Sequence, residues 1–243
     1  MYISGIEKLP QKKNRIYIDG EYAFMLYDRD MKIYHLESAG FDENEGYENR
    51  IEISGELYSR IMKETVIRRA HQKALAILER MERSEAELRQ KLKTDMYPDM
   101  VTDETIAWLK QLHYLDDSRY AQSYIRVRME NTSRQELIGK LRAKGIDKET
   151  ALEAYMICRE ELNIKNSRKI SEADDQGCED DTDEPDPEQQ AAIRALKKKL
   201  GVERNITPKE QRSAIGYMLR KGFRRNEIVR AFESLGLQID YEE

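Results

Sequence analysis

The residues that could carry out catalysis are few and scattered along the 243-residue chain. His35, His71 and His113 lie far apart, without the spacing of metal ligands. Asp116 and Asp117 could act as an acid and a base, but acids directly before an apolar helical stripe are more often helix caps. The sequence contains no Gly-x-x-x-x-Gly-Lys-Ser/Thr phosphate loop. We therefore expect no catalytic residue, no metal and no cofactor, and a protein that is not an enzyme.

Basic side chains are the stronger candidates for binding. They could form a discontinuous stripe that faces DNA phosphates or acidic patches on a protein. The alternative is a solvated helix face paired with nearby Glu residues. Lys144 and Lys221 have a further alternative, because cations are favoured at helix C-termini. The candidate partner-binding residues are Arg83, Arg126, Arg128, Lys140, Arg142, Lys144, Arg220, Lys221, Arg224 and Arg225.

Three tyrosines accompany these cations. Tyr120, Tyr124 and Tyr155 could stack on nucleic-acid bases, but aromatic residues at helical spacing usually belong to a core. We expect them to be core residues.

A helical cassette positions many of the candidates, and it occurs three times. The segment SRQELIGKLRAKGID at 133–147 begins with Ser133 and Glu136, a Ser-x-x-Glu capping box. Ser84 with Glu87 repeats this signal, and Thr207 with Glu210 repeats it again behind a proline at the first helical position. The spacing predicts a helix start at each of the three sites.

Two of the cassettes also share a stop signal. Gly145 and Gly222 each follow a lysine and precede an apolar residue, as expected for a left-handed glycine that ends a helix. The first copy has Met96-Tyr97-Pro98 at this place, so we expect it to be looser.

Each cassette lies within a longer helical pattern. In the first unit Thr102 could cap a helix with Ile106, Leu109 and Leu112, and Asp116 or Asp117 could cap the next. Apolar stripes continue through the second and third units. They comprise Tyr120, Ala121, Tyr124 and Ile125; Leu137, Leu141, Leu152, Tyr155 and Met156; Ile193, Leu196 and Leu200; and Ile228, Val229 and Phe232.

The N-terminal region differs from the rest. Alternation on both sides of Asp19-Gly20 predicts a β-hairpin, with a short third strand near residues 50–54. A helix without Gly or Pro then runs from Glu56 to about Arg83.

Composition limits the remaining possibilities. Charged residues make up 37% of the chain and mean hydropathy is −0.84, which favours several small cores over one thick core. The net charge of −5 combines −5 for residues 1–56, +5 for 57–170, −10 for 171–190 and +5 for 191–243. Cys158 and Cys178 are expected to be free thiols. Without an apolar signal core or spanning segment, a cytoplasmic protein is expected.

These patterns predict a mainly α protein of tandem three-helix repeats, elongated and curved, with a small N-terminal β-hairpin extension. The acidic segment is expected to be a disordered linker, either a solvated insertion or a strand that folds back on the basic helices. The expected parts are a hairpin cap at 1–56, a long helix and first unit at 57–130, a second unit at 131–170, the linker at 171–190 and a third unit at 191–243.

An ordered set of motifs resembles the RecX family, bacterial regulators of the RecA recombinase. It consists of Arg83-Ser84-x-x-Glu87-Leu88-x-x-x-Leu92, Asp117-x-x-Tyr120-Ala121-x-x-Tyr124-x-x-x-Arg128, and Leu141-x-x-Lys144-Gly145. The missing first glycine and the acidic insertion depart from the family pattern.

The resemblance implies a monomer that binds the RecA–single-stranded-DNA filament, with weak direct contact to DNA and no membrane partner. It implies inhibition of recombinase, ATPase and SOS co-protease activity, by blocked filament extension or by disassembly. Arg83 and Arg128 lie in the motifs and are favoured among the candidates. A helical-repeat DNA-binding module and a general helical adaptor are the alternatives from the residues alone.

Overall fold

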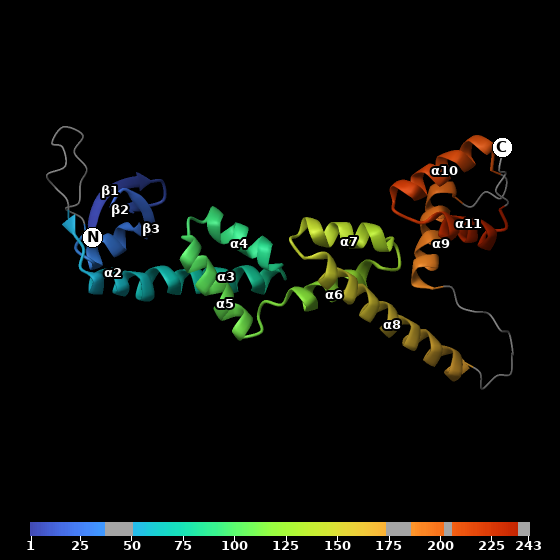
Figure 1. The fold of residues 1–243 in the computed structure, drawn as a ribbon, viewed down its shortest axis with the longest axis horizontal. Coiled ribbons are helices and arrows are strands. Elements are labelled where there is room, and N and C mark those ends of the chain that lie inside the picture. The colour runs from blue at the N-terminus through green and yellow to red at the C-terminus, as the bar shows by residue number, and fades with distance from the viewer. Residues whose placement is uncertain (37–50, 174–185, 202–205, 238–243) are drawn as a thin grey trace. The chain divides into compact units, whose positions relative to one another are not determined.

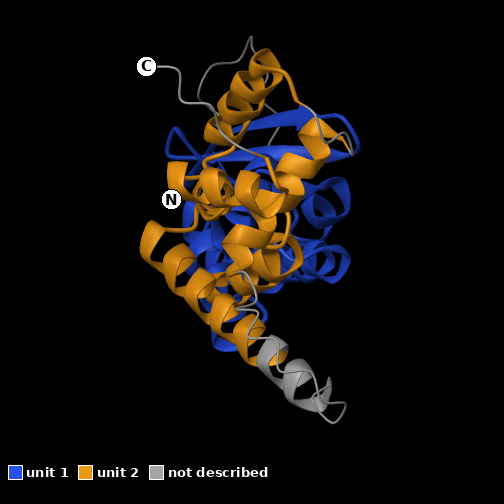
Figure 2. Cartoon of the chain, turned by 90° about the vertical axis from the view of Figure 1, so that its right-hand side faces the viewer, with its two compact units in different colours: residues 1–116 blue, residues 117–243 orange. Residues whose placement is uncertain are grey.

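The structure is a computed structural model that describes residues 1–36, 51–173, 186–201 and 206–237, with the backbone alone for 166–173. The chain forms two compact units, residues 1–116 and 117–243, drawn in two colours in Figure 2. Figure 1 shows a small sheet followed by helices. In order, the elements are β1 (Tyr2–Leu9), β2 (Lys13–Ile18), β3 (Glu21–Tyr27), α1 (Asp28–Ile33), β4 (Ile51–Glu52), α2 (Gly55–Ile61), η2 (Met62–Ile67), α3 (Arg68–Arg80), α4 (Glu85–Thr94), α5 (Asp99–Gln111), α6 (Asp117–Arg128), α7 (Arg134–Ala143), α8 (Lys148–Ala173), α9 (Pro187–Leu200), α10 (Pro208–Arg220) and α11 (Arg225–Ser234).

The N-terminal sheet is larger than the predicted hairpin. Its strand order is β3-β2-β1-β4, and each neighbouring pair is antiparallel. The hairpin β2–β3 is confirmed, and Asp19 and Gly20 both have the positive φ of a type I′ turn, 50° and 92°. The sequence analysis missed β1 and the short helix α1. Fully buried side chains of Ile16, Phe24 and Leu26 form the sheet's share of the core.

One continuous helix supports this sheet. It consists of α2, the π-helical segment η2 and α3, which confirms the predicted long helix, although it ends at Arg80 rather than near Arg83. Ile61, Val66 and Ala70 on this helix join the core cluster of the sheet. Arg69 on α3 also pairs with the buried carboxylate of Asp30 on α1. The sheet thus shares one core with the start of the helical region.

Three tandem three-helix units follow, as the sequence predicts. The first consists of α3, α4 and α5 around Leu88 and Leu92. The second consists of α6, α7 and α8 around Leu137 and Leu141. The third consists of α9, α10 and α11, with Phe232 in its core. Helix α6 packs with α7 and α8, so residues 117–128 belong to the second unit and not to the first, where the expected boundary at 130 placed them.

The three predicted helix starts are present, and two have the full capping box. Ser84 accepts from the Glu87 amide and Thr207 from the Glu210 amide, while the glutamate of each pair accepts from the cap amide. Ser133 accepts from the Glu136 amide at 3.2 Å, but the Glu136 carboxylate contacts Lys140 and Lys221 instead. The reciprocal half of the predicted box is therefore absent at Ser133.

The ends of α7 and α10 have the predicted glycine stop. Gly145 and Gly222 have φ of 83° and 84°, and the amides of Ile146 and Phe223 reach back to Leu141 and Met218 at 3.1 Å. This is the predicted Schellman geometry.

The first copy has the same ending without a glycine. Met96 has φ of 64°, and the Tyr97 amide donates to the Leu92 carbonyl at 3.1 Å. A methionine thus takes the left-handed position that glycine holds in the other two copies, at an energetic cost.

Several other expectations also change. Thr102 is not a cap, because α5 begins at Asp99 and the Thr102 hydroxyl is buried inside it. Leu112 and Met156 are exposed rather than in the core. The stretch expected as a linker is helical at 171–173 and again from Pro187, while residues 174–185 and Cys178 lie outside the described residues. Cys158 is a buried free thiol, as predicted.

Candidate functional site

The second and third three-helix units meet where α7 begins. The Ser133 hydroxyl that caps α7 also donates to the carbonyl of Lys221 at the end of α10. The Lys221 ammonium lies 3.3 Å from the Glu136 carboxylate. A Cβ on Gly222 would lie 3.0 Å from both Ser133 Oγ and Gln135 Cβ, so a side chain there would push these neighbours away by a few tenths of an ångström. The glycine therefore serves both the helix end and this close approach.

A hollow of about 500 Å³ lies beside this junction. Helix α7 forms one wall, and the start of α8, the start of α9 and the turn between α10 and α11 form the rest. Its charged lining residues are Arg134, Arg142, Lys148, Arg224 and Glu188. Four cations thus face the hollow with one carboxylate.

The cations around the hollow have few acidic partners. Arg142 and Lys148 have no ion pair within the described parts of the chain, and Arg134 lies over the Tyr155 ring at 5.4 Å. Arg224 is two-thirds exposed and lies 4.0 Å from Glu227, the outer limit of an ion pair. The positive charge at the hollow is therefore only partly compensated.

Glu188 is the carboxylate in this lining, and its surroundings disfavour its charge. Burial raises the pKa of Glu188, and the nearby carboxylate of Glu227 raises it further, against the smaller opposing effects of Arg224 and Arg134. The arginines at the hollow are thus not arranged to hold Glu188 as a strong ion-pair partner.

Arg142 and Arg224 are among the candidates predicted from the sequence, whereas Arg134 and Lys148 are not. A signal for the missed pair was present, because Arg134 and Lys148 are the first residues of α7 and α8. Cations are disfavoured at helix N-termini, where the helix dipole is already positive.

Other candidate cations are engaged in local contacts. Arg126 pairs with Glu161 at 2.9 Å, and Lys140 pairs with Glu136 at 2.7 Å. Burial alone would raise the pKa of Glu136, but hydrogen bonds and charges from Lys140 and Lys221 outweigh it and lower that pKa. The Lys140–Glu136 pair has the i,i+4 spacing of the salt-bridged helix face, whereas the Arg126–Glu161 pair joins α6 to α8.

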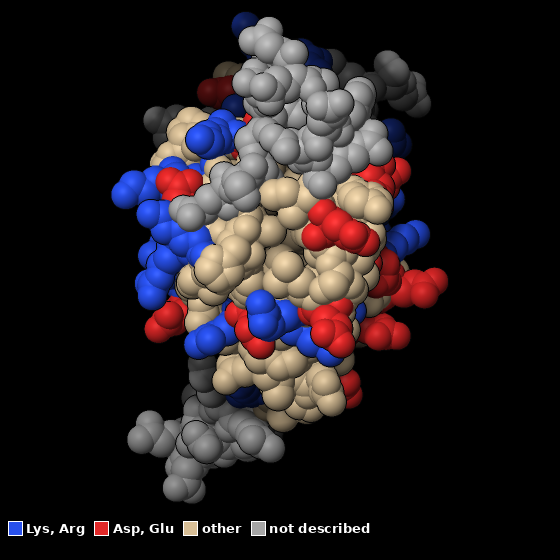
Figure 3. Space-filling view, turned by 90° about the vertical axis from the view of Figure 1, so that its left-hand side faces the viewer, with Lys and Arg blue, Asp and Glu red and all other residues tan. Residues whose placement is uncertain are grey.

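The remaining candidates are distributed between the two compact units. Arg83 lies in the first unit, 3.8 Å from Glu87, with its Nε buried. Arg220 and Arg225 are exposed. On the face drawn in Figure 3, Lys and Arg gather along the left edge and elsewhere lie beside Asp and Glu.

Tyr120 and Tyr124 form a cation-rich cluster on α6. The rings of Tyr120 and Tyr124 stack with centroids 6.4 Å apart. Arg128 lies 4.0 Å from the Tyr124 centroid, and Lys144 lies within 6 Å of both rings. Tyr155 is buried at 2% exposure, and the other two rings are half-buried against the same core, so the expectation of core tyrosines is confirmed.

In the described ranges, no three His, Cys, Asp or Glu side chains lie together as a metal site would require. Among the helices that the structure describes, none has the length and apolar character needed to cross a membrane.

Comparison with known proteins connects these units to one family. Residues 70–109 match the family model of the RecX first three-helix domain, and residues 116–154 match that of the second. The chain is 29% identical to the regulatory protein RecX of Clostridium acetobutylicum over 60% of this chain and 64% of that protein. It is 27% identical to the RecX of Bacillus licheniformis over 99% of this chain and 78% of that protein.

Two solved structures share the fold. A crystal structure of regulatory protein RecX superimposes with a TM-score of 0.56 at 18% identity, covering 97% of this chain and 98% of that one. RecX from Lactobacillus salivarius gives 0.55 at 19% identity, over 71% of this chain and 98% of that one. The matches to the RecX of Clostridium acetobutylicum and of Clostridium beijerinckii span less than two thirds of those proteins, 64% and 62%.

The two family domains coincide with structural units. The first match lies within α3–α5, and the second runs from the residue before α6 into α8. Several relatives share the name regulatory protein RecX, and the motifs that suggested the resemblance lie in these helices. The chain contains the first and second three-helix domains of the RecX family.

Proposed function

We propose that this protein binds the RecA–single-stranded-DNA filament and inhibits the recombinase, ATPase and SOS co-protease activities of RecA. It would do so by blocking filament extension or by promoting disassembly. The observation that carries the proposal is the tandem arrangement of the first and second RecX three-helix domains, followed by a third unit of the same build.

Repeated helical units suit a repeated partner. Each unit presents its own surface, and several weak contacts to successive protomers of a filament would add through effective concentration. The exposed cations on different units, such as Arg128 and Arg225, offer such contacts. The proposal includes a non-enzymatic, monomeric regulator that acts in the cytoplasm.

Co-sedimentation with RecA filaments tests the partner. Filaments would be assembled on single-stranded DNA with a non-hydrolysable ATP analogue and compared with bare DNA at low and moderate salt. We expect the protein to sediment with the filament. As the salt concentration rises, its affinity for the filament should fall less than its affinity for bare DNA, because phosphate binding declines steeply with salt. Equal binding to filament and bare DNA at every salt concentration would contradict the proposal.

A charge-reversal pair locates the contact. Arg126→Glu with Arg128→Glu should weaken filament binding, whereas Lys63→Glu with Lys91→Glu, at exposed positions of the first compact unit, changes the net charge equally and should not. Equal weakening by both pairs would show a general charge effect and not a defined contact.

A helical-repeat DNA-binding module is the second candidate function. The specific observation in its favour is the basic hollow between α7 and the α10–α11 turn.

A further inference from the structure

We propose that the hollow lined by Arg134, Arg142, Lys148 and Arg224 is an anion site that takes the phosphate groups of a single strand of DNA. This inference assigns a ligand to the chain itself, so it can succeed or fail independently of the proposed action on RecA.

Charge is the first argument. Four cations and Glu188 leave the charged lining with a net charge of +3. Like charges around one hollow repel each other, and each is disfavoured unless water or a counter-charge compensates it. Arg142 and Lys148 have no carboxylate partner within the described residues, so an entering anion would meet cations that need not break an ion pair first.

The helix starts are a second and independent argument. Arg134 and Lys148 are the first residues of α7 and α8, and Arg224 is the N-cap residue of α11. Each side chain adds a positive charge where the exposed amides of its helix are already positive. The first turns of the three helices also carry Glu136, Glu149 and Glu227, so their positive charge is partly compensated. An anion at the shared hollow would add to that compensation.

The shape and chemistry favour phosphates over a protein carboxylate. A single carboxylate would leave a net charge of +2 uncompensated, while successive phosphodiesters bring one negative charge per nucleotide. Three arginines provide planar donor forks that match phosphate oxygens. The hollow of about 500 Å³ is also larger than a carboxylate needs, and Ile138 and Leu152 give it an apolar wall against which a sugar can pack.

Fluorescence anisotropy with a labelled oligothymidylate, without RecA, tests the inference on the full chain. Arg142→Gln with Arg224→Gln should weaken binding about tenfold and reduce the salt slope by about 1.4, which is about 0.7 for each lost phosphate contact. The control, Lys63→Gln with Lys91→Gln, removes the same charge from exposed positions that do not line the hollow and should keep both values close to those of the unaltered protein.

Three outcomes would overturn the inference. Equal losses in both double variants would show non-specific attraction. An unchanged affinity of the first variant, with an unchanged unfolding midpoint, would exclude the hollow. Competition with unlabelled ATP and with unlabelled oligothymidylate distinguishes two sources of phosphate. Binding of ATP without binding of the DNA strand would overturn the assignment to DNA.

Discussion

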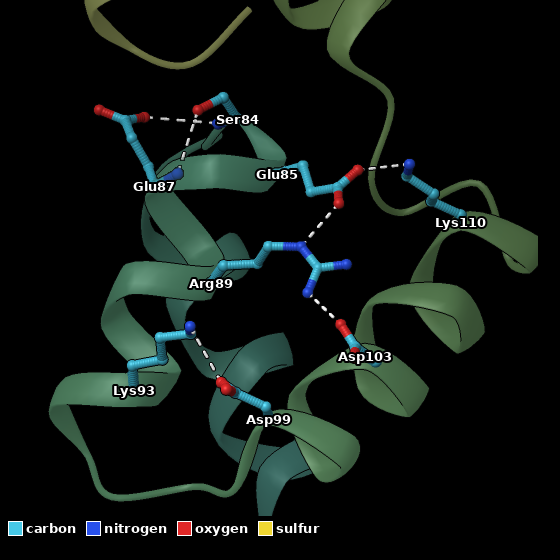
Figure 4. A network of polar contacts seen from close by, with 8 residues as sticks. All are labelled: Ser84, Glu85, Glu87, Arg89, Lys93, Asp99, Asp103 and Lys110. Carbon is cyan, nitrogen blue, oxygen red and sulfur yellow. Dashed lines mark hydrogen bonds and ion pairs between the residues drawn. The ribbon is translucent and has the colours of Figure 1, made fainter.

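The α4–α5 surface of the first three-helix unit and the hollow beside α7 use similar charges in opposite ways. In Figure 4, Arg89 lies between Glu85 and Asp103, and Lys110 reaches Glu85 from α5. Burial alone would raise the pKa of Glu85, but hydrogen bonds from Lys110 and Arg89 lower it below its usual value. At the hollow, the pKa of Glu188 is raised. Cations on α4–α5 join helices through ion pairs, whereas those at the hollow are only partly compensated by carboxylates.

The two regions nevertheless share the same apolar framework. Leu88 follows the Ser84–Glu87 cap on α4, as Leu137 follows the Ser133–Glu136 pair on α7, and both leucines are fully buried. The difference between the regions therefore lies in their surface charges and not in how their helices are packed.

Core truncation should have the largest effect and should be equal in the two regions. Leu88→Ala and Leu137→Ala should each cost about 3 kcal/mol of unfolding free energy, because each leaves a cavity in a packed core. Hydrogen exchange would show the loss of protection in the core that carries the substitution. Leu219→Ala, at a side chain 44% exposed, is the control and should cost little. An unchanged stability of Leu137→Ala would remove Leu137 from the core.

The second largest loss of stability is expected at the junction beside the hollow, where α7 meets the turn between α10 and α11. Gly222→Ala should destabilise by about 2 kcal/mol, because φ is 84° and the new Cβ would meet Ser133 and Gln135 at 3.0 Å. Gly236→Ala has a similar φ of 69° but open space around its Cβ, and should cost about 1 kcal/mol. Urea unfolding of the two variants measures the difference. Equal costs would mean that the contact between the second and third units does not constrain position 222.

The two carboxylates should respond to pH in opposite directions. The stabilisation from Glu85 is complete above its ordinary pKa of about 4.3 and is lost as pH falls through the lower folded value. Glu188 contributes most to folding stability below that ordinary pKa. This contribution is lost as pH rises through the higher pKa that Glu188 has in the folded protein.

Substitution converts these signs into a test. At pH 7, Glu85→Gln should lower the unfolding midpoint, while Glu188→Gln should leave it unchanged or raise it. Once the pH falls below the lowered folded pKa of Glu85, both variants should resemble the unaltered protein. A fall in the midpoint of Glu188→Gln at pH 7 would mean that the arginines hold this carboxylate as a strong partner, and the contrast between the two surfaces would fail.

The smallest expected effect concerns the helix end of the first unit. Met96→Gly should stabilise by about 0.5 to 1 kcal/mol, because glycine takes the positive φ without strain. Gly145→Met is the reverse exchange at the corresponding end of α7 and should destabilise by about the same amount. A loss of stability in Met96→Gly would show that the contact of the Met96 sulfur with Arg15 outweighs the backbone strain.

The cassettes could be predicted because their signals are local. Capping pairs such as Ser84 with Glu87, and the glycines at 145 and 222, are read from residues within one or two turns. The turn at Asp19-Gly20 was found for the same reason. Strand β1 was missed because its pairing with β2 depends on the partner strand more than on its own sequence.

The hollow could not be predicted from spacing. Arg134 and Glu188 approach it from helices that are more than 50 residues apart in the sequence, and only the packing of the second unit on the third brings them together. The available sequence signal was the unfavourable cation at the start of each of α7 and α8. This signal indicates a binding site only when the structure shows that both helix starts line one hollow.

DNA-dependent ATP hydrolysis by RecA tests the central claim most directly. RecA filaments would be formed on single-stranded DNA, and the protein would then be added at substoichiometric amounts. We predict a progressive fall in the rate of ATP hydrolysis as the protein is added. The Lys63→Glu, Lys91→Glu variant should inhibit hydrolysis as strongly, and the Arg126→Glu, Arg128→Glu variant should inhibit it less. Unchanged hydrolysis at stoichiometric and higher amounts of the folded protein would contradict the proposed regulation of RecA.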